Sequence, residues 1–240
     1  MAATVESILG HLEVVERERA ARAASPSLLK KVQAIKGFQQ RRFSHTYADL
    51  LATARYAGAA RFFLDELYGP GDFSQRDTQF ARVVPALVRL FPRDVVDTVD
   101  TLAQLHALSE RLDSAMGRHL AQDAVDAGAY IGAWQATGQA TERELQIALT
   151  LSVGQSLDEL TRKPLLRHTL RMMRGPARAA GLSALQQFLE SGFDTFLAMR
   201  GAKEFLAIVS TREHLLAASL FDQAVATDAG ARERALGQLP

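Results

Sequence analysis

The chain has 240 residues, of which 48% are apolar and 23% are charged; its formal net charge is +1 and it has no cysteine. This composition excludes an intrinsically disordered chain, and the lack of cysteine excludes disulfides, zinc-thiolate sites and iron–sulfur clusters. The near-neutral charge gives no global attraction to nucleic acid or anionic lipid, so any electrostatic function must be local.

The N-terminal stretch MAATVESILGHLEVVERERAARAA carries four glutamates and lacks the basic and apolar regions of a signal peptide. No apolar run approaches the roughly 18 residues that a membrane-spanning helix needs. We therefore expect a cytoplasmic protein without membrane association. Nothing in the composition divides the chain, so we predict a single domain over residues 1–240 with a frayed tail over about 228–240.

Residues typical of helix starts and helix ends recur along the chain. The alternation of apolar and polar residues that is typical of strands is nearly missing. These patterns predict an all-α, single-domain multi-helix bundle of about eight or nine helices. Ser25 and Pro26 form an N-cap followed by proline at the first helical position. The first three helices are expected over about 5–22, from Pro26 to about Phe43, and from about Thr46 to Leu67, with Gly69 and Pro70 ending the third.

The stretch FFLDELYGPGDFSQRD, residues 62–77, combines apolar, acidic and turn-forming residues. The structural interpretation is a helix end followed by a capped helix start, with Asp72 or Ser74 as the cap and Asp77 in a capping-box-like position. The functional alternative is an acid–base or metal-binding cluster of Asp65, Glu66, Asp72 and Asp77.

Further capping residues and helix-breaking residues predict the bounds of the remaining helices. Pro85 is expected to kink its helix, and Thr141 with Glu144 has the spacing of a capping box. The expected helices run over about 75–91, 93–120, 123–136, from Thr141 onward, between Pro164 and Gly175-Pro176, between Gly181 and Gly201, and over 203–226.

The strongest charge pattern is LTRKPLLRHTLRMMRGPARAAG, which lies in a stretch without any acid between Glu159 and Glu190. Arg167, Arg171, Arg174 and Arg178 are spaced by four, three and four residues, which aligns them along one helix face. Such a row suits a phosphate, an acidic peptide or a nucleic-acid backbone. The alternative is an ordinary solvated face, or a set of ion pairs with acids elsewhere, including the acids of residues 65–77.

A second stretch without acids, SPSLLKKVQAIKGFQQRRFSHTY, interleaves basic residues with Phe38, Phe43 and Tyr47. Basic and aromatic residues together suit single-stranded nucleic acid. The neutral total charge and the lack of a nucleic-acid-binding motif argue instead for an amphipathic surface helix.

Two histidines of one predicted helix raise the possibility of metal or haem binding. His106 with Glu110, and His119 with Asp123, are pairs four residues apart that share a helix face. LAQLHALSERLD is partly similar to the proximal helix of globins, which makes His106 a candidate haem ligand. Ser109 stands where those proteins carry a basic residue, and no HExxH or ferritin-like ligand pattern is present. No cofactor is therefore predicted, with haem as the alternative.

Other site classes find no support in the sequence. Nucleotide-binding glycine loops and a G-x-S-x-G elbow are missing.

The run LQQFLESGFDTFLAMRGAKEFLAIVSTRE carries aromatic and small residues that indicate close helix packing, with an apolar pocket or an oligomer face as the alternative. Arg212 and Glu213 in this run are expected to form surface or interhelical ion pairs.

Several phrases of the chain carry a resemblance: FFLDELYGPGDFSQRD, LVRLFP, TLAQLHALSERLD, RGPARAAGLSALQQFLESGF and MRGAKEFL. In these phrases, over nearly its whole length, the chain resembles an uncharacterised family of bacterial helical proteins with an FFLxELYGPxDFxxRD motif. The resemblance implies one helical domain, and it implies no reaction and no functional residues.

We expect a non-enzymatic binding or regulatory protein that recognises a partner protein or a small anionic ligand through the four arginines named above. A globin-like haem sensor using His106 and a metal-dependent helical enzyme are the alternatives. Nucleic-acid binding is disfavoured, and formation of a homo-oligomer is left open.

Overall fold

The computed structural model describes residues 3–67 and 73–240, and within these ranges the protein is all helical. The α-helices are α1 (Val5–Ala23), α2 (Pro26–Thr46), α3 (Ala48–Ala52), α4 (Ala57–Phe62), α5 (Ser74–Leu90), α6 (Arg93–His119), α7 (Ala127–Thr137), α8 (Ala140–Thr161), α9 (Pro164–Met172), α10 (Arg174–Ala179), α11 (Ser183–Ala198), α12 (Lys203–Phe221) and α13 (Ala229–Leu236). A π-helical turn, η1 (Phe63–Leu67), follows α4, and a 3-10 turn, η2 (Gln223–Ala226), precedes α13.

The all-α class is confirmed, but the predicted count of eight or nine helices is too low. The extra helices in the described ranges are short: α3, α4, α10 and α13 have five, six, six and eight residues. No helix in those ranges is both long and apolar enough to cross a membrane.

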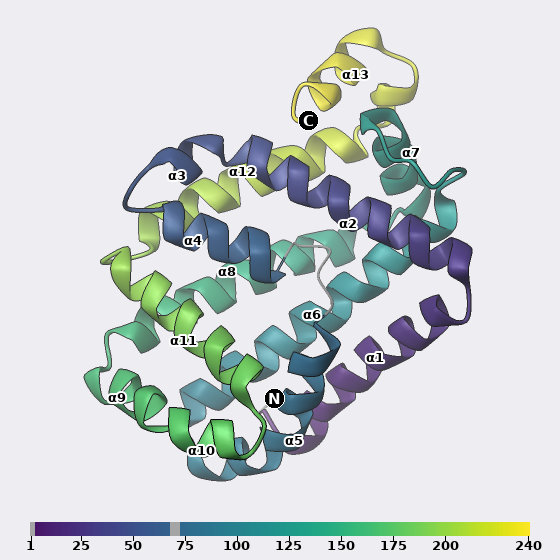
Figure 1. Cartoon of the computed structure of the whole chain (residues 1–240). Coiled ribbons are helices and arrows are strands. Elements are labelled where there is room, and N and C mark those ends of the chain that lie inside the picture. Colours follow the sequence, from purple (N-terminus) through teal and green to yellow (C-terminus); the bar gives the residue numbers. More distant parts are fainter. Residues whose placement is uncertain (1–2, 68–72) are drawn as a thin grey trace.

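The long helix α6 runs through the middle of the molecule (Figure 1). It packs against α1, α2, α7 and α8, while α12 lies along α8, and α11 contacts α4, α5 and α8. Gly117 allows α6 to approach α2 closely, because a Cβ atom there would lie 2.7 Å from the Cγ2 atom of Val32. These contacts place α6 at the centre of the helical bundle.

Several predicted helix starts are correct. The Ser25 side chain caps α2, which begins at Pro26, and α9 begins at Pro164. Breaks at Gly181 and Gly201 are confirmed, with φ values of 70° and 111° that favour glycine. The helix α5 continues through Pro85 to Leu90.

The predicted third helix is wrong as a single element, because the chain turns between α3 and α4. Tertiary contacts of Arg55 and Tyr56 explain the break. Arg55 Nε donates to the Met199 carbonyl at 3.0 Å, and the Tyr56 hydroxyl donates to Glu204 at 2.5 Å. Packing onto the α11–α12 turn thus overrides the helix propensity of an alanine-rich segment.

Two predicted caps are also wrong. The N-cap of α5 is Phe73, without a side-chain cap, and Asp77 points to other helices. The helix α8 begins at Ala140, so neither Thr141 nor Glu144 forms a capping box. Gly69, Pro70 and Asp72 lie outside the described residues.

The C-terminal tail is ordered rather than frayed. The last long helix ends at Phe221 instead of continuing to residue 226, and η2 and α13 follow. Ala231, Ala235 and Leu239 are buried against the cluster that contains Trp134 and Leu220. Apolar residues spaced along the tail therefore dock it onto the bundle beside α7 and α12 (Figure 1).

Candidate functional site

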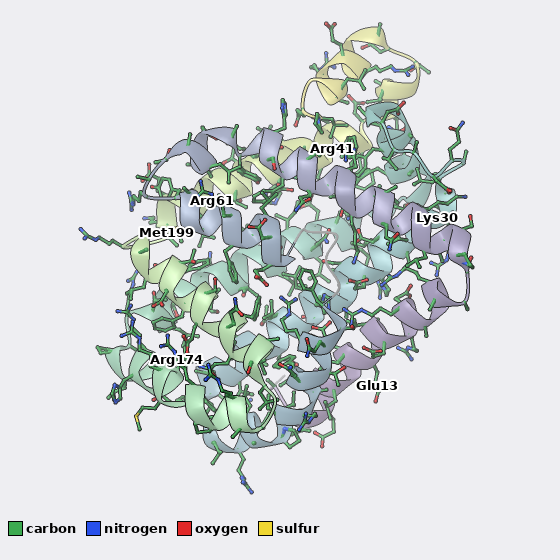
Figure 2. All side chains as sticks on the ribbon, in the orientation of Figure 1. Glu13, Lys30, Arg41, Arg61, Arg174 and Met199 are labelled. Atoms are coloured by element: carbon green, nitrogen blue, oxygen red, sulfur yellow. The ribbon has the colours of Figure 1, made fainter. Side chains whose placement is uncertain are left out.

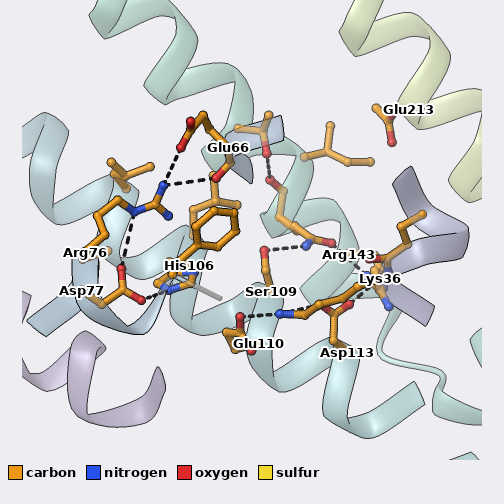
Figure 3. A pocket seen from close by; sticks show the side chains of 18 of the residues that line it. Lys36, Glu66, Arg76, Asp77, His106, Ser109, Glu110, Asp113, Arg143 and Glu213 are labelled. Atoms are coloured by element: carbon orange, nitrogen blue, oxygen red, sulfur yellow. Dashed lines mark hydrogen bonds and ion pairs between the residues drawn. The ribbon is translucent and has the colours of Figure 1, made fainter. Parts of the chain in front are cut away.

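An internal cavity of about 150 Å³ lies where the apolar clusters of the protein meet. Its apolar wall includes Leu105 of α6, Ile147 of α8, Val209 of α12 and Phe188 of α11. Charged side chains line it at two places, which we call the His106 end (Glu66, Arg76, Asp77 and His106) and the Arg143 end (Lys36, Arg42, Glu110, Asp113, Arg143 and Glu213). Figure 3 shows both ends, with Ser109 between them.

The His106 end is organised around the buried carboxylate of Asp77. One of its oxygens, Oδ2, lies 2.6 Å from Arg19 Nη2 of α1 and 2.8 Å from His106 Nε2 of α6. An ionised carboxylate only accepts hydrogen bonds, so Nε2 of His106 carries the proton. Within the described part of the chain, the other ring nitrogen, Nδ1, has no hydrogen-bond partner. The His106 side chain also lines the cavity.

Neighbouring charges keep Asp77 ionised. Burial acts to raise the pKa of Asp77, but the hydrogen bond and charge of His106 and the charge of Arg19 outweigh it, so the pKa lies below its usual value. This ion network also joins α1, α5 and α6.

Arg76 extends the His106 end toward η1. Its guanidinium donates to Glu66 Oε2 at 3.1 Å and lies 4.2 Å from the ring centroids of both Phe73 and Phe188. Burial lowers the pKa of Arg76, and the charges of Asp77 and Glu66 oppose that effect. π-Helical turns such as η1 often occur at functional sites, and this one places Glu66 on the cavity wall.

At the Arg143 end, Glu110 is held between two cations. Its carboxylate accepts from Arg22 Nη2 at 2.5 Å and from Lys36 Nζ at 2.6 Å. Burial acts to raise the pKa of Glu110, but Lys36 and Arg22 together bring it below its usual value. Glu110 is therefore a buried carboxylate that is fully compensated.

Asp113, one helical turn farther along α6, has the opposite behaviour. It accepts from Gln39 Nε2 at 3.0 Å, while Lys36 Nζ is 3.9 Å away. Burial raises the pKa of Asp113 in spite of the nearby charges of Lys36 and Arg143. Two carboxylates of one helix face thus have pKa values shifted in opposite directions by their surroundings.

A third carboxylate, Glu213 of α12, reaches the same end of the cavity. Its Oε1 atom accepts from Arg42 Nη1 at 2.5 Å and from the Tyr47 hydroxyl at 2.6 Å. The neighbouring Arg212 forms a two-pronged ion pair with Asp49. The expectation of interhelical ion pairs for Arg212 and Glu213 is therefore confirmed.

Arg143 and Trp134 complete the Arg143 end. The guanidinium of Arg143 lies 4.0 Å from the Trp134 ring centroid and donates to Gln146 Oε1 at 3.0 Å. Trp134 is only 8% exposed, and its Nε1–H group is buried without a hydrogen-bond acceptor in the described residues. A buried donor of this kind carries a desolvation cost unless it finds a partner, so it points to an acceptor supplied from outside the chain.

Three cations, Lys36, Arg42 and Arg143, and three carboxylates, Glu110, Asp113 and Glu213, line this end of the cavity. Arg22 does not line the cavity but lies behind Glu110, so the group with Arg22 has four cations and three carboxylates. Excess positive charge in a low-dielectric interior attracts an anion.

The predicted acidic cluster is divided by the structure. Asp77 and Glu66 line the cavity and both interact with Arg76, whereas Asp65 is exposed and Asp72 lies outside the described residues. No group of three or more His, Asp or Glu residues suited to a metal ion is found in residues 3–67 and 73–240.

The predicted arginine row lies on the surface, away from the cavity lining. It is divided between α9, with Arg167 and Arg171, and α10, with Arg174 and Arg178. Arg167 pairs with Asp194 at 2.9 Å and Arg174 with Glu190 at 2.5 Å, both on α11. The intramolecular partners are thus acids of α11 rather than those of residues 65–77.

The other candidates are placed as follows. His106 faces Asp77, while His119 is exposed at the end of α6. The rings of Phe38, Phe43 and Tyr47 are buried while Lys30 and Arg41 are exposed, as expected for an amphipathic surface helix; Lys36 and Arg42 of the same helix line the cavity. Close packing in the C-terminal run is confirmed by the burial of its core residues, Phe193, Phe196, Met199, Ala202 and Phe205.

Sequence reasoning missed the residues that build the Arg143 end, namely Lys36, Gln39, Arg42, Asp113, Trp134 and Arg143. Their ion pairs and hydrogen bonds connect positions as far apart as 171 residues, between Arg42 and Glu213. The one available signal was a set of charged residues at core positions of helical patterns.

One comparison with known proteins gave a match. The family model described as "Domain of unknown function (DUF8198)" matches residues 18–227, which is most of the chain and includes every charged residue of the cavity. No curated protein and no solved structure matches the chain. The protein therefore belongs to the DUF8198 family of domains of unknown function.

Proposed function

We propose that this protein binds a small organic anion in its central cavity and acts by binding rather than by catalysis. The observation that carries the proposal is the buried Trp134 Nε1–H group without an acceptor in the described residues, beside the cations Lys36, Arg42 and Arg143 of the cavity wall. The sequence suggested that an anion binds at the arginine row of α9 and α10. We propose instead that the anion binds in the cavity.

The size and lining of the cavity define the ligand class. A cavity of about 150 Å³ has the volume of engineered apolar cavities that take up benzene. Leu105, Ile147 and Val209 supply apolar wall, and the Arg143 end supplies donors. A carboxylate on a small apolar body matches both features, with its oxygens toward Trp134 and Arg143.

Neither cofactor alternative is proposed. A haem or metal bound through His106 Nε2 would have to displace the buried Asp77 carboxylate, which is itself held by Arg19. A bacterial, cytoplasmic setting is kept as part of the proposal, because it agrees with the lack of cysteine.

Fluorescence offers a direct test, because Trp134 is the only tryptophan of the chain. Benzoate and hexanoate are titrated into the full chain, with benzyl alcohol and hexanol as neutral counterparts. We expect the carboxylates, and not the alcohols, to change the tryptophan emission. Native mass spectrometry of the protein as purified should show either the chain with a small bound molecule or the chain alone. In the second case, the chain should bind added benzoate.

A matched pair of variants assigns the binding to the cavity. Trp134→Phe keeps an aromatic ring and removes the N–H donor, so calorimetry should show benzoate binding weakened about tenfold to hundredfold, the value of one hydrogen bond to a charged group. Tyr56→Phe also removes one polar hydrogen from a buried ring, but outside the cavity lining, and should leave benzoate binding unchanged. A bare native mass together with no binding of either carboxylate would refute the proposal.

A further inference from the structure

The helix α9 presents an apolar surface to solvent. None of its residues is buried, and Leu165 and Met172 are 81% and 67% exposed. These two residues are seven positions apart and therefore lie on the same side of the helix. Large apolar side chains this exposed, on one side of one helix, indicate a surface that becomes covered.

The same surface is strongly basic. Residues 160–189 contain no acid, and the cations of the segment are Arg162, Lys163, Arg167, Arg171, Arg174 and Arg178. Four of them form ion pairs, with Asp158, Asp94, Asp194 and Glu190. Arg171 and Arg178 are exposed and form no ion pair with the residues that the structure describes. Arg171, on the side of α9 that borders α11, and Arg178 of α10 are thus the two cations of the segment that form no ion pair within the described residues.

The shape of the surface helps to decide what covers it. In Figure 1, α9 and α10 lie at the edge of the molecule, far from α7 and α13, and Figure 2 shows Arg174 on this face. The hollow between α9 and α11 measures only about 10 Å³, so no groove is present there to receive a partner's side chain. A projecting helix with apolar and basic residues suits a fluid, flat, negatively charged surface, which needs no matching pocket.

We propose that α9 and α10 form a docking surface for anionic phospholipid. Leu165 and Met172 insert at the level of the headgroups, and Arg171 and Arg178 meet the lipid phosphates. Exposed leucine and methionine would gain nothing from the phosphate backbone of a nucleic acid, and α9 and α10 carry no Phe, Tyr or Trp for base stacking. The net charge of +1 does not preclude such a local surface, and this proposal departs from the expectation of no membrane association.

Vesicle flotation with the full chain tests the proposal. The vesicles contain phosphatidylcholine alone or phosphatidylcholine with phosphatidylglycerol, at low and at high ionic strength. We expect binding to the anionic vesicles only, and a loss of that binding at high ionic strength. Arg171→Gln should weaken binding about fivefold, the value of one cation near an anionic surface. Leu165→Ser should weaken it about tenfold, because one apolar anchor is lost.

Two control variants match these changes elsewhere. Leu215→Ser on α12 removes an apolar side chain that is 59% exposed, and Arg232→Gln on α13 removes an exposed cation. Both should bind anionic vesicles as the unchanged protein does. All four variants replace exposed residues, so their thermal midpoints should agree and loss of binding would not reflect unfolding.

Several outcomes would overturn the proposal: no flotation with anionic vesicles, equal binding to neutral vesicles, or equal effects of the variants and their controls. Binding to a DNA duplex that depends on Arg171 would assign the surface to nucleic acid. A dimer in solution that Leu165→Ser dissociates would assign it to a second copy of the chain.

Discussion

The arginines of the cavity and those of α9 and α10 show two different uses of the same side chain. Arg22, Arg42 and Arg143 are at most 5% exposed, and each reaches across to another helix. The side chains of Arg167 and Arg174 are 41% and 60% exposed, and they pair with the adjacent α11. The surface group is conspicuous in sequence because it is contiguous, whereas the buried group is dispersed over most of the chain. A run of charge is thus easily recognised in the sequence, whereas a buried site is assembled from scattered positions.

The largest expected effect comes from breaking a buried ion pair. Glu110→Gln keeps the shape of the side chain but leaves Arg22 and Lys36 without their carboxylate, so we expect a loss of about 3–5 kcal/mol in the free energy of unfolding at neutral pH. Because the pKa of Glu110 is lowered in the folded protein, its contribution is present above the unfolded pKa and is lost as pH falls through the folded value. Urea unfolding at several pH values should show the difference vanish under acid conditions. A loss below about 1 kcal/mol at neutral pH would show that the buried pair is no stronger than a surface pair.

Asp113 sharpens the comparison within the cavity, since its pKa shift has the opposite sign. Its raised pKa means that its contribution to stability is present below the unfolded pKa and is lost as pH rises through the folded value. Asp113→Asn should therefore change the free energy of unfolding by less than about 1 kcal/mol at neutral pH. As pH rises, the variant should become more stable relative to the unchanged protein. The same urea series measures it. A loss as large as that of Glu110→Gln would contradict the opposite roles of the two carboxylates.

The smallest effect is expected on the surface. Arg174→Gln removes the pair with Glu190, and its cost should be the smallest of the three because water replaces the lost partner. High salt should leave the Glu110→Gln difference nearly unchanged and reduce the Arg174→Gln difference further. Thermal melts in low and high salt distinguish the two, and a large, salt-independent cost for Arg174→Gln would remove the contrast between surface and interior.

Local signals predicted much of the fold. Ser25 and Pro26 mark the start of α2, Pro92 precedes α6, and Pro164 opens α9, because caps and prolines act within a few residues. The break between α3 and α4 was not predictable, since Arg55 and Tyr56 are fixed by residues more than 140 positions later.

The candidate site was harder to predict from the sequence than the fold was. His106 and Asp77 were both singled out from the sequence, for roles other than the contact that they make with each other. The positions of Trp134 and Arg143 follow from how α7 and α8 pack on α6, which no local pattern encodes.

The helix α6 has a consequence for how the family can vary in length. It contributes His106, Glu110 and Asp113 at intervals of four and three residues, which places them on one stripe facing the interior. Adding or deleting one residue between them would rotate the later residues by about 100° and remove them from the cavity. Insertions among related chains are therefore expected in the connections between helices, while the middle of α6 keeps its length.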